Sequence, residues 1–94
     1  MAIRRVVVAE PAFFKFCALS PTDEDIALIR GVKSRLKEEP EIGYPVPFST
    51  IPNQRFTDAG KWRVVYEIRD EGNYDPWILI THIDDHMLLL VDVD

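Results

Sequence analysis

The sequence predicts an α+β fold in which a helical hairpin packs on one face of a mainly antiparallel, four- to five-stranded sheet, in the order β-α-α-β-β-β-β. The segment Gly60–Arg69 alternates between large apolar and polar side chains, which is the period of a half-buried strand. Residues 20–40 combine helix-start signals with apolar residues at helical spacing. The run Trp77–Ile83 is almost entirely apolar, as in a buried strand.

Length and composition describe one globular domain, which we assign to residues 1–94. Hydrophobic residues make up 47% of the chain and charged residues 29%, which excludes a disordered tail. A core of this size is modest, so a homodimer or a tightly bound partner is expected. The single cysteine, Cys17, lies in an apolar run, so we expect a buried, reduced thiol and a cytoplasmic location. The N-terminal apolar run stops at Glu10-Pro11, too short for a signal peptide or a membrane span, and no membrane contact is expected.

The net charge of −5 is unevenly distributed along the chain. All 11 lysines and arginines lie within residues 1–69, whereas residues 70–94 contain only acidic charges. Because nucleic acid repels an acidic segment, any phosphate-binding surface is expected on the first two thirds of the chain.

The N-terminal third predicts one strand and one short helix. Ile3–Ala9 reads as the first strand, which Glu10-Pro11 ends because proline suits the first turn of a helix. Pro11–Leu19 reads as a helix with a buried stripe made of Phe13, Phe16 and Cys17. Phe14 lies off that stripe, so it is either an exposed contact residue or additionally buried.

The second helix has the clearest boundaries. Ser20 is the expected N-cap, Pro21 the first helical residue, and Pro40 stops the helix. Its expected buried stripe consists of Ile26, Ile29, Val32 and Leu36. A basic row, formed by Arg30, Lys33 and Lys37, is either a solvated face or a wall beside a ligand.

The remaining chain predicts turns and strands in succession. Glu41–Pro47 is expected to lack regular structure, and Phe48–Thr57 to contain an edge strand because Pro52 would interrupt a central ladder. Asp58-Ala59-Gly60 and Asp70–Asp75 read as hairpin connections. Trp77–Ile83 is expected to be a central strand covered on both faces. The sequence then predicts a turn at Asp84-Asp85-His86 and a last strand over Met87–Val93.

Three polar side chains stand out for chemistry. Arg63 lies opposite the aromatic face of its strand, where it is either a functional groove residue or part of a structural ion pair. His82 is expected on the same side of its strand as Ile78 and Ile80, where it is either a hydrogen-bonded sheet histidine or an acid–base group. His86 adjoins Asp84 and Asp85, but three neighbouring turn residues rarely give metal-ligand geometry, so no metal site is expected.

The segment Gly60-Lys61-Trp62-Arg63-Val64-Val65-Tyr66-Glu67-Ile68 resembles the glycine-led strand of the RelE/ParE-like toxins of bacterial toxin–antitoxin systems. The helix end Arg35–Pro40 is similar to the close of that family's second helix, and Ile78–Ile83 falls where its members often carry a histidine or a basic residue. The order of elements covers nearly the whole chain, whereas the sharp residue match covers about ten positions. The chain departs from the family in its acidic C-terminal third, which has no arginine near its end.

The resemblance implies a growth-inhibiting toxin held inactive by a cognate antitoxin, which would cover the helical hairpin and the apolar C-terminal strand. RelE-like members cut messenger RNA on the ribosome through its 2′-hydroxyl and need no cofactor. By position, Arg63 would contact the scissile phosphate and His82 would act as the acid–base residue. His86 would partly substitute for the basic residue that the family carries near its C-terminus. Further phosphate or RNA contacts would come from Arg55 and Lys61, and from the helical row Arg30, Lys33 and Lys37. The alternative is a non-catalytic or DNA-gyrase-directed protein-interaction domain on the same fold.

Overall fold

The computed structural model describes residues 3, 5–70, 72 and 75–85. Within them the chain order is β1 (Val6–Val8), α1 (Glu10–Ala18), α2 (Asp23–Glu38), β2 (Tyr44–Pro45), β3 (Gln54–Ala59), β4 (Trp62–Arg69) and β5 (Trp77–Asp85). The expected α+β class is confirmed. The predicted last strand over Met87–Val93 lies outside the described residues.

The strands form one mixed sheet in the spatial order β1-β5-β4-β3-β2. The pairs β2–β3, β3–β4 and β4–β5 are antiparallel, whereas β1 pairs with β5 in parallel. The parallel pair arises because the two helices lie between β1 and the rest of the sheet in sequence and return the chain to its starting end. β5 is therefore a central strand, with β1 on one side and β4 on the other.

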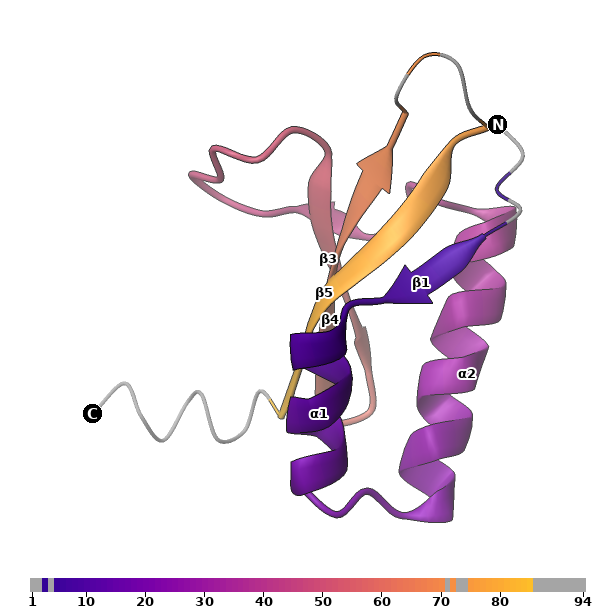
Figure 1. Cartoon of the computed structure of the whole chain (residues 1–94), viewed down its shortest axis with the longest axis vertical. Helices are drawn as coiled ribbons and strands as arrows, with labels where there is room; N and C mark the ends of the chain where they lie inside the picture. Colours follow the sequence, from indigo (N-terminus) through magenta and orange to yellow (C-terminus); the bar gives the residue numbers. More distant parts are fainter. Residues whose placement is uncertain (1–2, 4, 71, 73–74, 86–94) are drawn as a thin grey trace.

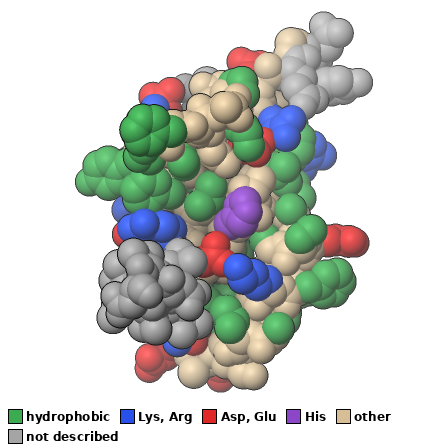
Figure 2. Space-filling view, turned by 90° about the vertical axis from the view of Figure 1, so that its left-hand side faces the viewer, with side chains coloured by type: hydrophobic (Ala, Val, Ile, Leu, Met, Phe, Trp, Pro, Cys, Tyr) green, Lys and Arg blue, Asp and Glu red, His purple; other side chains and the backbone are tan. Residues whose placement is uncertain are grey.

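Both helices lie on the same side of the sheet, and α1 runs alongside the lower end of β5 in Figure 1. The opposite side, which we call the open face, carries no described helix. Figure 2 looks onto this face, with the histidine side chain near its middle and apolar and charged side chains around it. None of the described helices is long and apolar enough to cross a membrane.

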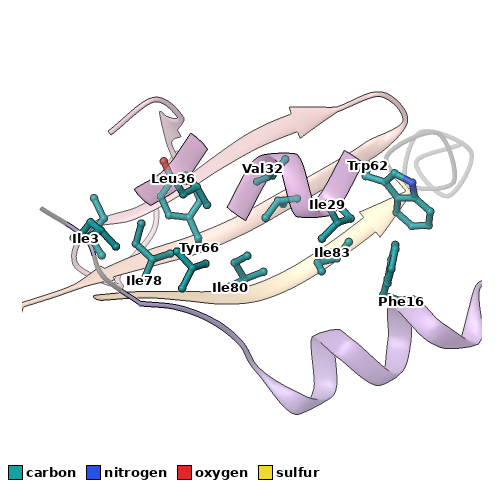
Figure 3. Packing of buried hydrophobic residues seen from close by; sticks show 13 residues of the cluster. Ile3, Phe16, Ile29, Val32, Leu36, Trp62, Tyr66, Ile78, Ile80 and Ile83 are labelled. Atoms are coloured by element: carbon teal, nitrogen blue, oxygen red, sulfur yellow. The ribbon is translucent and has the colours of Figure 1, made fainter. Parts of the chain in front are cut away.

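The core fills the space between the helices and the sheet (Figure 3). From β4 it takes Trp62, Val64, Tyr66 and Ile68, the set predicted by the period-2 pattern. The α2 stripe is confirmed as well, with Ile29, Val32 and Leu36 buried and Ile26 partly buried against the core. The aromatic face of β4 thus has the burial that its sequence predicts.

The stripe predicted for α1 is wrong in part. Phe16 is buried edge-to-face against Trp62, and the other buried position is Ala12. Phe13 is 52% exposed, and Cys17 is exposed rather than a buried thiol. The helix therefore faces the sheet through the i, i+4 pair of Ala12 and Phe16. Phe14 is 62% exposed, so of its two alternatives additional burial is excluded.

The start of α2 lies two residues later than predicted. Its N-cap is Thr22, not Ser20, which has a positive φ of 52° and belongs to the preceding turn. Thr22 and Asp25 form a reciprocal capping box, and Asp25 also accepts a 3.0 Å hydrogen bond from Nε1 of Trp62. The bond from Trp62, followed by that from the Thr22 backbone, lowers the pKa of the Asp25 carboxyl. This carboxylate thereby joins the first turn of α2 to β4.

The segment after α2 is held by the hydroxyl of Tyr66, a residue with no exposed surface. This hydroxyl donates to the carbonyl of Pro40 at 2.8 Å and accepts from the backbone N–H of Gly43 at 3.1 Å. A side chain at Gly43 would collide with the carbonyl oxygen of Phe56, so the close approach requires glycine. Arg55 donates to the carbonyl oxygen of Gly43 at 2.8 Å.

Two predictions for this segment are wrong. The stretch 41–47 was expected to be irregular, but Tyr44 and Pro45 form β2, the edge strand. The strand expected within Phe48–Thr57 is present as β3, but it lies between β2 and β4 and not at the edge. It also continues through Asp58 and Ala59, which were expected to belong to a hairpin turn. The hydrogen bonds of Gly43 hold β2 at the edge of the sheet. In the loop between β2 and β3, Phe48 and Asn53 adopt positive φ angles.

β5 also differs from its prediction. It continues through Asp84 and Asp85, which pair with Arg63 and Trp62, so these acids do not form the expected turn. The strand is buried on one face only, because no described helix covers its other face.

We predict that Tyr66→Phe lowers the free energy of unfolding by about 1–3 kcal/mol, the cost of leaving buried hydrogen-bonding groups without their partner. Urea denaturation followed by circular dichroism measures this loss. The matched control is Tyr44→Phe, which removes a hydroxyl from a side chain that is 70% exposed and leaves the stability unchanged. Equal stabilities for Tyr66→Phe and the native chain would contradict the role given to this hydroxyl.

The same variant has a predicted pH signature. Burial raises the pKa of Tyr66 because it disfavours the phenolate, although the N–H of Gly43 acts in the opposite direction. A raised folded-state pKa contributes stability that is present below the unfolded value of about 10 and is lost as the pH rises through the folded value. The stability gap between native chain and Tyr66→Phe should therefore narrow above about pH 10.

Candidate functional site: the open face of the sheet

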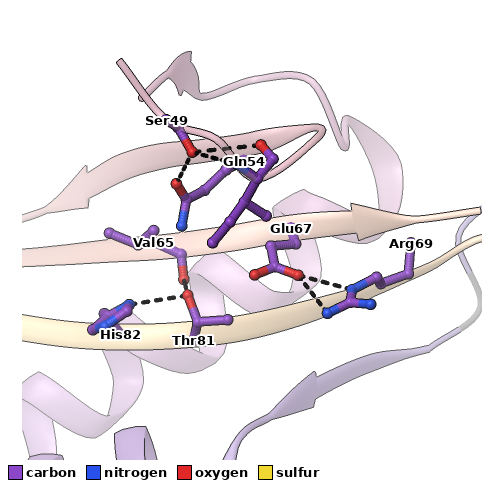
Figure 4. Close-up of polar contacts among 8 residues, drawn as sticks. Ser49, Gln54, Val65, Glu67, Arg69, Thr81 and His82 are labelled. Carbon is purple, nitrogen blue, oxygen red and sulfur yellow. Dashed lines mark hydrogen bonds and ion pairs between the residues drawn. The ribbon is translucent and has the colours of Figure 1, made fainter. Parts of the chain in front are cut away.

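The open face carries the side chains of the sheet that point away from the helices. The pairing register places on it one side chain each from β1 and β2, three from β3 and four each from β4 and β5: Val7; Tyr44; Gln54, Phe56 and Asp58; Arg63, Val65, Glu67 and Arg69; Trp77, Leu79, His82 and Asp84. At one end, the loop between β2 and β3 lies over Glu67, which is buried and paired with Arg69 at 2.7 Å. The Ser49 hydroxyl donates to Oε1 of Gln54 and accepts from the backbone N–H of Ile51, and these bonds hold the loop (Figure 4). The other end remains accessible.

A β-bulge turns His82 onto this face. Tyr66 pairs with Ile80, but Val65 pairs with His82, so Thr81 is an extra residue in β5. The sequence predicted that His82 shares the side of Ile78 and Ile80, since an unbroken strand keeps a period of two. That prediction is wrong because the bulge reverses the alternation after Thr81, and His82 is exposed on the open face while Ile83 is buried.

Thr81 also orients the imidazole of His82 (Figure 4). Its hydroxyl donates to the carbonyl of Val65 at 3.3 Å, and its oxygen lies 3.0 Å from Nδ1 of His82. Since the hydroxyl proton is used towards Val65, the oxygen accepts from Nδ1–H. From this network we assign neutral His82 as the Nδ1–H tautomer, with Nε2 left as a proton acceptor.

Arg63 forms a structural ion pair, one of the two roles that the sequence left open. Its Nε and Nη2 donate to the two carboxylate oxygens of Asp58 at 2.9 and 3.1 Å, and this carboxylate raises the pKa of the guanidinium. The guanidinium lies over the ring of Phe56, 4.5 Å from its centroid. Asp58 takes only two of the five N–H donors. Among the described residues none accepts a hydrogen bond from Nη1, so this nitrogen keeps donors for an anion.

Arg63 and His82 lie close together on this face. His82 is directly opposite Val65, and Arg63 is two residues before Val65 on the same side of β4. Such diagonal neighbours have backbones about 7–8 Å apart, within reach of one phosphodiester group between long side chains. The bulge thus places His82 on the same face as Arg63.

Acidic partners neutralise the basic side chains around this pair. Lys15 of α1 forms an ion pair with Asp84, and Lys61 in the β3–β4 turn lies 3.8 Å from Asp85. Together with the Arg63–Asp58 pair, these contacts leave the accessible end of the face without a net positive charge. The Arg63–Asp58 pair is exposed at both side chains and contributes little stability, whereas the side chains of Asp84 and Asp85 are each only 15% exposed.

The other predicted site residues lie elsewhere. Arg55 points to the helix side and serves the backbone carbonyls of Glu41 and Gly43. The basic row on α2, Arg30, Lys33 and Lys37, lines a shallow hollow of about 330 Å³ with Val6 and Ser34, on the helix layer. His86 lies outside the described residues. The structure therefore divides the expected phosphate-binding residues between two sides of the molecule and places Lys61 at the rim.

The chain matches no protein-family model, and the comparison with curated proteins finds no match. A function is therefore inferred from the geometry of the open face. No cluster of three or more potential metal ligands occurs within residues 3, 5–70, 72 and 75–85. Sequence reasoning missed Thr81, Asp58 and Phe56, because their contacts with His82 and Arg63 depend on the strand register.

We predict that neutral His82 is the Nδ1–H tautomer and that Thr81→Val abolishes this preference by removing the accepting oxygen. Nitrogen-15 NMR of the imidazoles measures the tautomer directly, with a His86→Gln background to assign the signals. Valine has the shape of threonine and should preserve the fold, as circular dichroism would verify. An Nε2–H tautomer in the native chain would contradict the hydrogen-bond chain from Val65 to His82.

Proposed function

We propose that this chain is the toxin component of a bacterial toxin–antitoxin pair and cleaves messenger RNA on the ribosome with its open face. The observation that carries the proposal is the bulge that brings His82 beside Arg63, with Nε2 of the histidine and Nη1 of the arginine both unoccupied by described groups. Bulges recur next to active sites, where they redirect a side chain. The α+β architecture and the element order are consistent with the RelE/ParE-like resemblance.

Arg63 is suited to hold the scissile phosphate. Its guanidinium is oriented by Asp58 and Phe56, so its free donors are fixed in direction before RNA arrives. As the phosphorus becomes pentacoordinate, negative charge develops on the non-bridging oxygens. Positioned donors stabilise such charge more in the transition state than in the bound substrate.

His82 is suited to take the proton of the attacking hydroxyl. The 2′-oxygen attacks the adjacent phosphorus, the bond from phosphorus to the 5′-oxygen of the next nucleotide breaks, and Nε2 of His82 receives the 2′ proton. The leaving 5′-oxygen takes up a proton from solvent, so the products carry a 2′,3′-cyclic phosphate and a 5′-hydroxyl. Thr81 is a positioning residue in this reaction because it fixes the tautomer.

The antitoxin would bind the helix layer. Phe13 and Phe14 pack edge-to-face with each other on the exposed side of α1, and Leu19 is 40% exposed just after it. Such an apolar patch favours a partner protein. The partner would leave the toxin inactive either by covering the path to the open face or by preventing entry into the ribosome.

A second candidate is a non-catalytic or gyrase-directed interaction domain. The observation that favours it is the pairing of Arg63, Lys15 and Lys61 with aspartates, because a neutral face attracts RNA weakly. On this account the charge pairs of the open face recognise complementary charges of a protein.

We predict that the induced chain arrests bacterial growth and that Arg63→Ala and His82→Ala each relieve the arrest. Removing a phosphate-stabilising donor or a general base lowers a rate by at least about 100-fold. Primer extension on a reporter messenger RNA, translated in vitro with ribosomes and the purified chain, measures the cleavage. The matched control is Arg69→Ala, which removes another ion-paired arginine of β4 on the same face and should leave cleavage unchanged.

The two candidates separate in this assay. Growth arrest with no new ends in messenger RNA would contradict the nuclease and support the interaction domain. Cleavage that persists in His82→Ala would contradict the role of His82. A soluble, folded chain that causes no arrest would contradict both toxin readings.

A further inference from the structure

A row of side chains crosses the open face at right angles to the strands. Tyr44 of β2 pairs with Phe56 of β3, Phe56 pairs with Val65 of β4, and Val65 pairs with His82 of β5. Neighbouring strands are about 4.8 Å apart, so the row is continuous across four strands. Three of its four members are rings, and Arg63 lies over the ring of Phe56.

The row is accessible where it leads away from His82. Tyr44 is 70% exposed, and its ring centroid lies 5.9 Å from that of Phe56, tilted by 41°. The guanidinium of Arg63 covers Phe56 at 4.5 Å and presents its own outer plane, whose orientation Asp58 fixes. Aromatic rings and guanidinium planes are the surfaces on which unpaired bases stack.

The place of Tyr44 is set by buried contacts. The preceding residue, Gly43, is hydrogen-bonded to Tyr66 and Arg55, so β2 cannot shift along β3 without breaking them. Tyr44 is thus a rigid, exposed ring at one end of a row whose other end is the candidate acid–base residue. A surface ordered before binding costs less conformational entropy on binding.

We propose that Tyr44 and the Phe56–Arg63 stack hold two successive bases of single-stranded RNA beside the phosphate that is cleaved at His82; this inference rests on the proposed function. Two features favour RNA over a peptide. A peptide strand adds along a sheet edge and a helix needs a groove, whereas this row crosses the middle of the face. Stacking also needs little net positive charge, so it provides affinity where the cations are paired.

Binding of a short, 5′-labelled oligodeoxyuridylate tests the inference, because this single strand has no 2′-hydroxyl and cannot be cleaved. Fluorescence anisotropy with the purified chain should show binding that Tyr44→Leu weakens by at least about five-fold, since leucine keeps the apolar bulk but removes the ring. Tyr44→Phe keeps the ring and should bind like the native chain. Phe48→Leu is the matched control, because Phe48 is fully exposed but lies off the row.

The inference is overturned if Tyr44→Leu binds the oligonucleotide as tightly as the native chain, or if the folded native chain does not bind it. It is also overturned if Tyr44→Leu relieves growth arrest without any oligonucleotide binding, because the row would then contact a protein. Ring-dependent binding by a chain that never cleaves messenger RNA would support the row and refute the nuclease. Normal cleavage of messenger RNA by Tyr44→Leu would support the nuclease and refute the role of the row.

Discussion

The hydroxyl of Tyr66 is the contact on which the outer half of the sheet depends. It joins β4 to the carbonyl of Pro40 at the end of α2 and to the N–H of Gly43, and both bonds are buried. Without them, the segment from the helix to β2 would expose backbone groups to an apolar core. The same tie fixes β2 against β3 and so places Tyr44 on the open face. A core interaction thereby determines the surface that we assign to RNA.

The bulge at Thr81 has the corresponding role at the centre of the sheet. The extra residue of a bulge disrupts the ladder locally, and here the side chain of that residue, Thr81, donates a hydrogen bond to the carbonyl of Val65 on the facing strand. The oxygen of the same hydroxyl then accepts from His82. One threonine satisfies the backbone, turns the histidine towards Arg63 and sets its tautomer. The residue that forms the bulge thus also orients the imidazole of the candidate site.

The sequence was sufficient for the parts of the fold that depend on periodicity. The buried face of β4 and the stripe of α2 follow from patterns of two and of three to four residues, and both are confirmed. The buried stripe predicted for α1 was wrong in part, because a nine-residue helix offers several possible stripes. The small Ala12, and not Phe13, faces the sheet. The predicted N-cap of α2 was wrong because Ser20 and Thr22 both have a hydroxyl that can cap a helix. Only the reciprocal hydrogen bonds with Asp25 distinguish Thr22 from Ser20.

The candidate site was predictable in its residue types but not in its geometry. Arg63 could be placed on the open face because β4 is regular up to that point. His82 could not, since a single inserted residue reverses the facing of every residue after it. The partners Asp58 and Phe56 belong to β3, whose register is set by tertiary contacts at Gly43. The helical row of Arg30, Lys33 and Lys37 matched a phosphate-binding pattern equally well, yet it lies on the other layer.

The central claim is that RNA meets the open face and not the helix layer. Chemical-shift mapping by NMR tests it most directly, with isotopically labelled chain and a single-stranded RNA in which the 2′-hydroxyls are methylated. The account predicts shifts concentrated at Tyr44, Phe56, Arg63 and His82, with little change at Arg30, Lys33 and Lys37. Shifts confined to the helical row, with the open face unchanged, would contradict it.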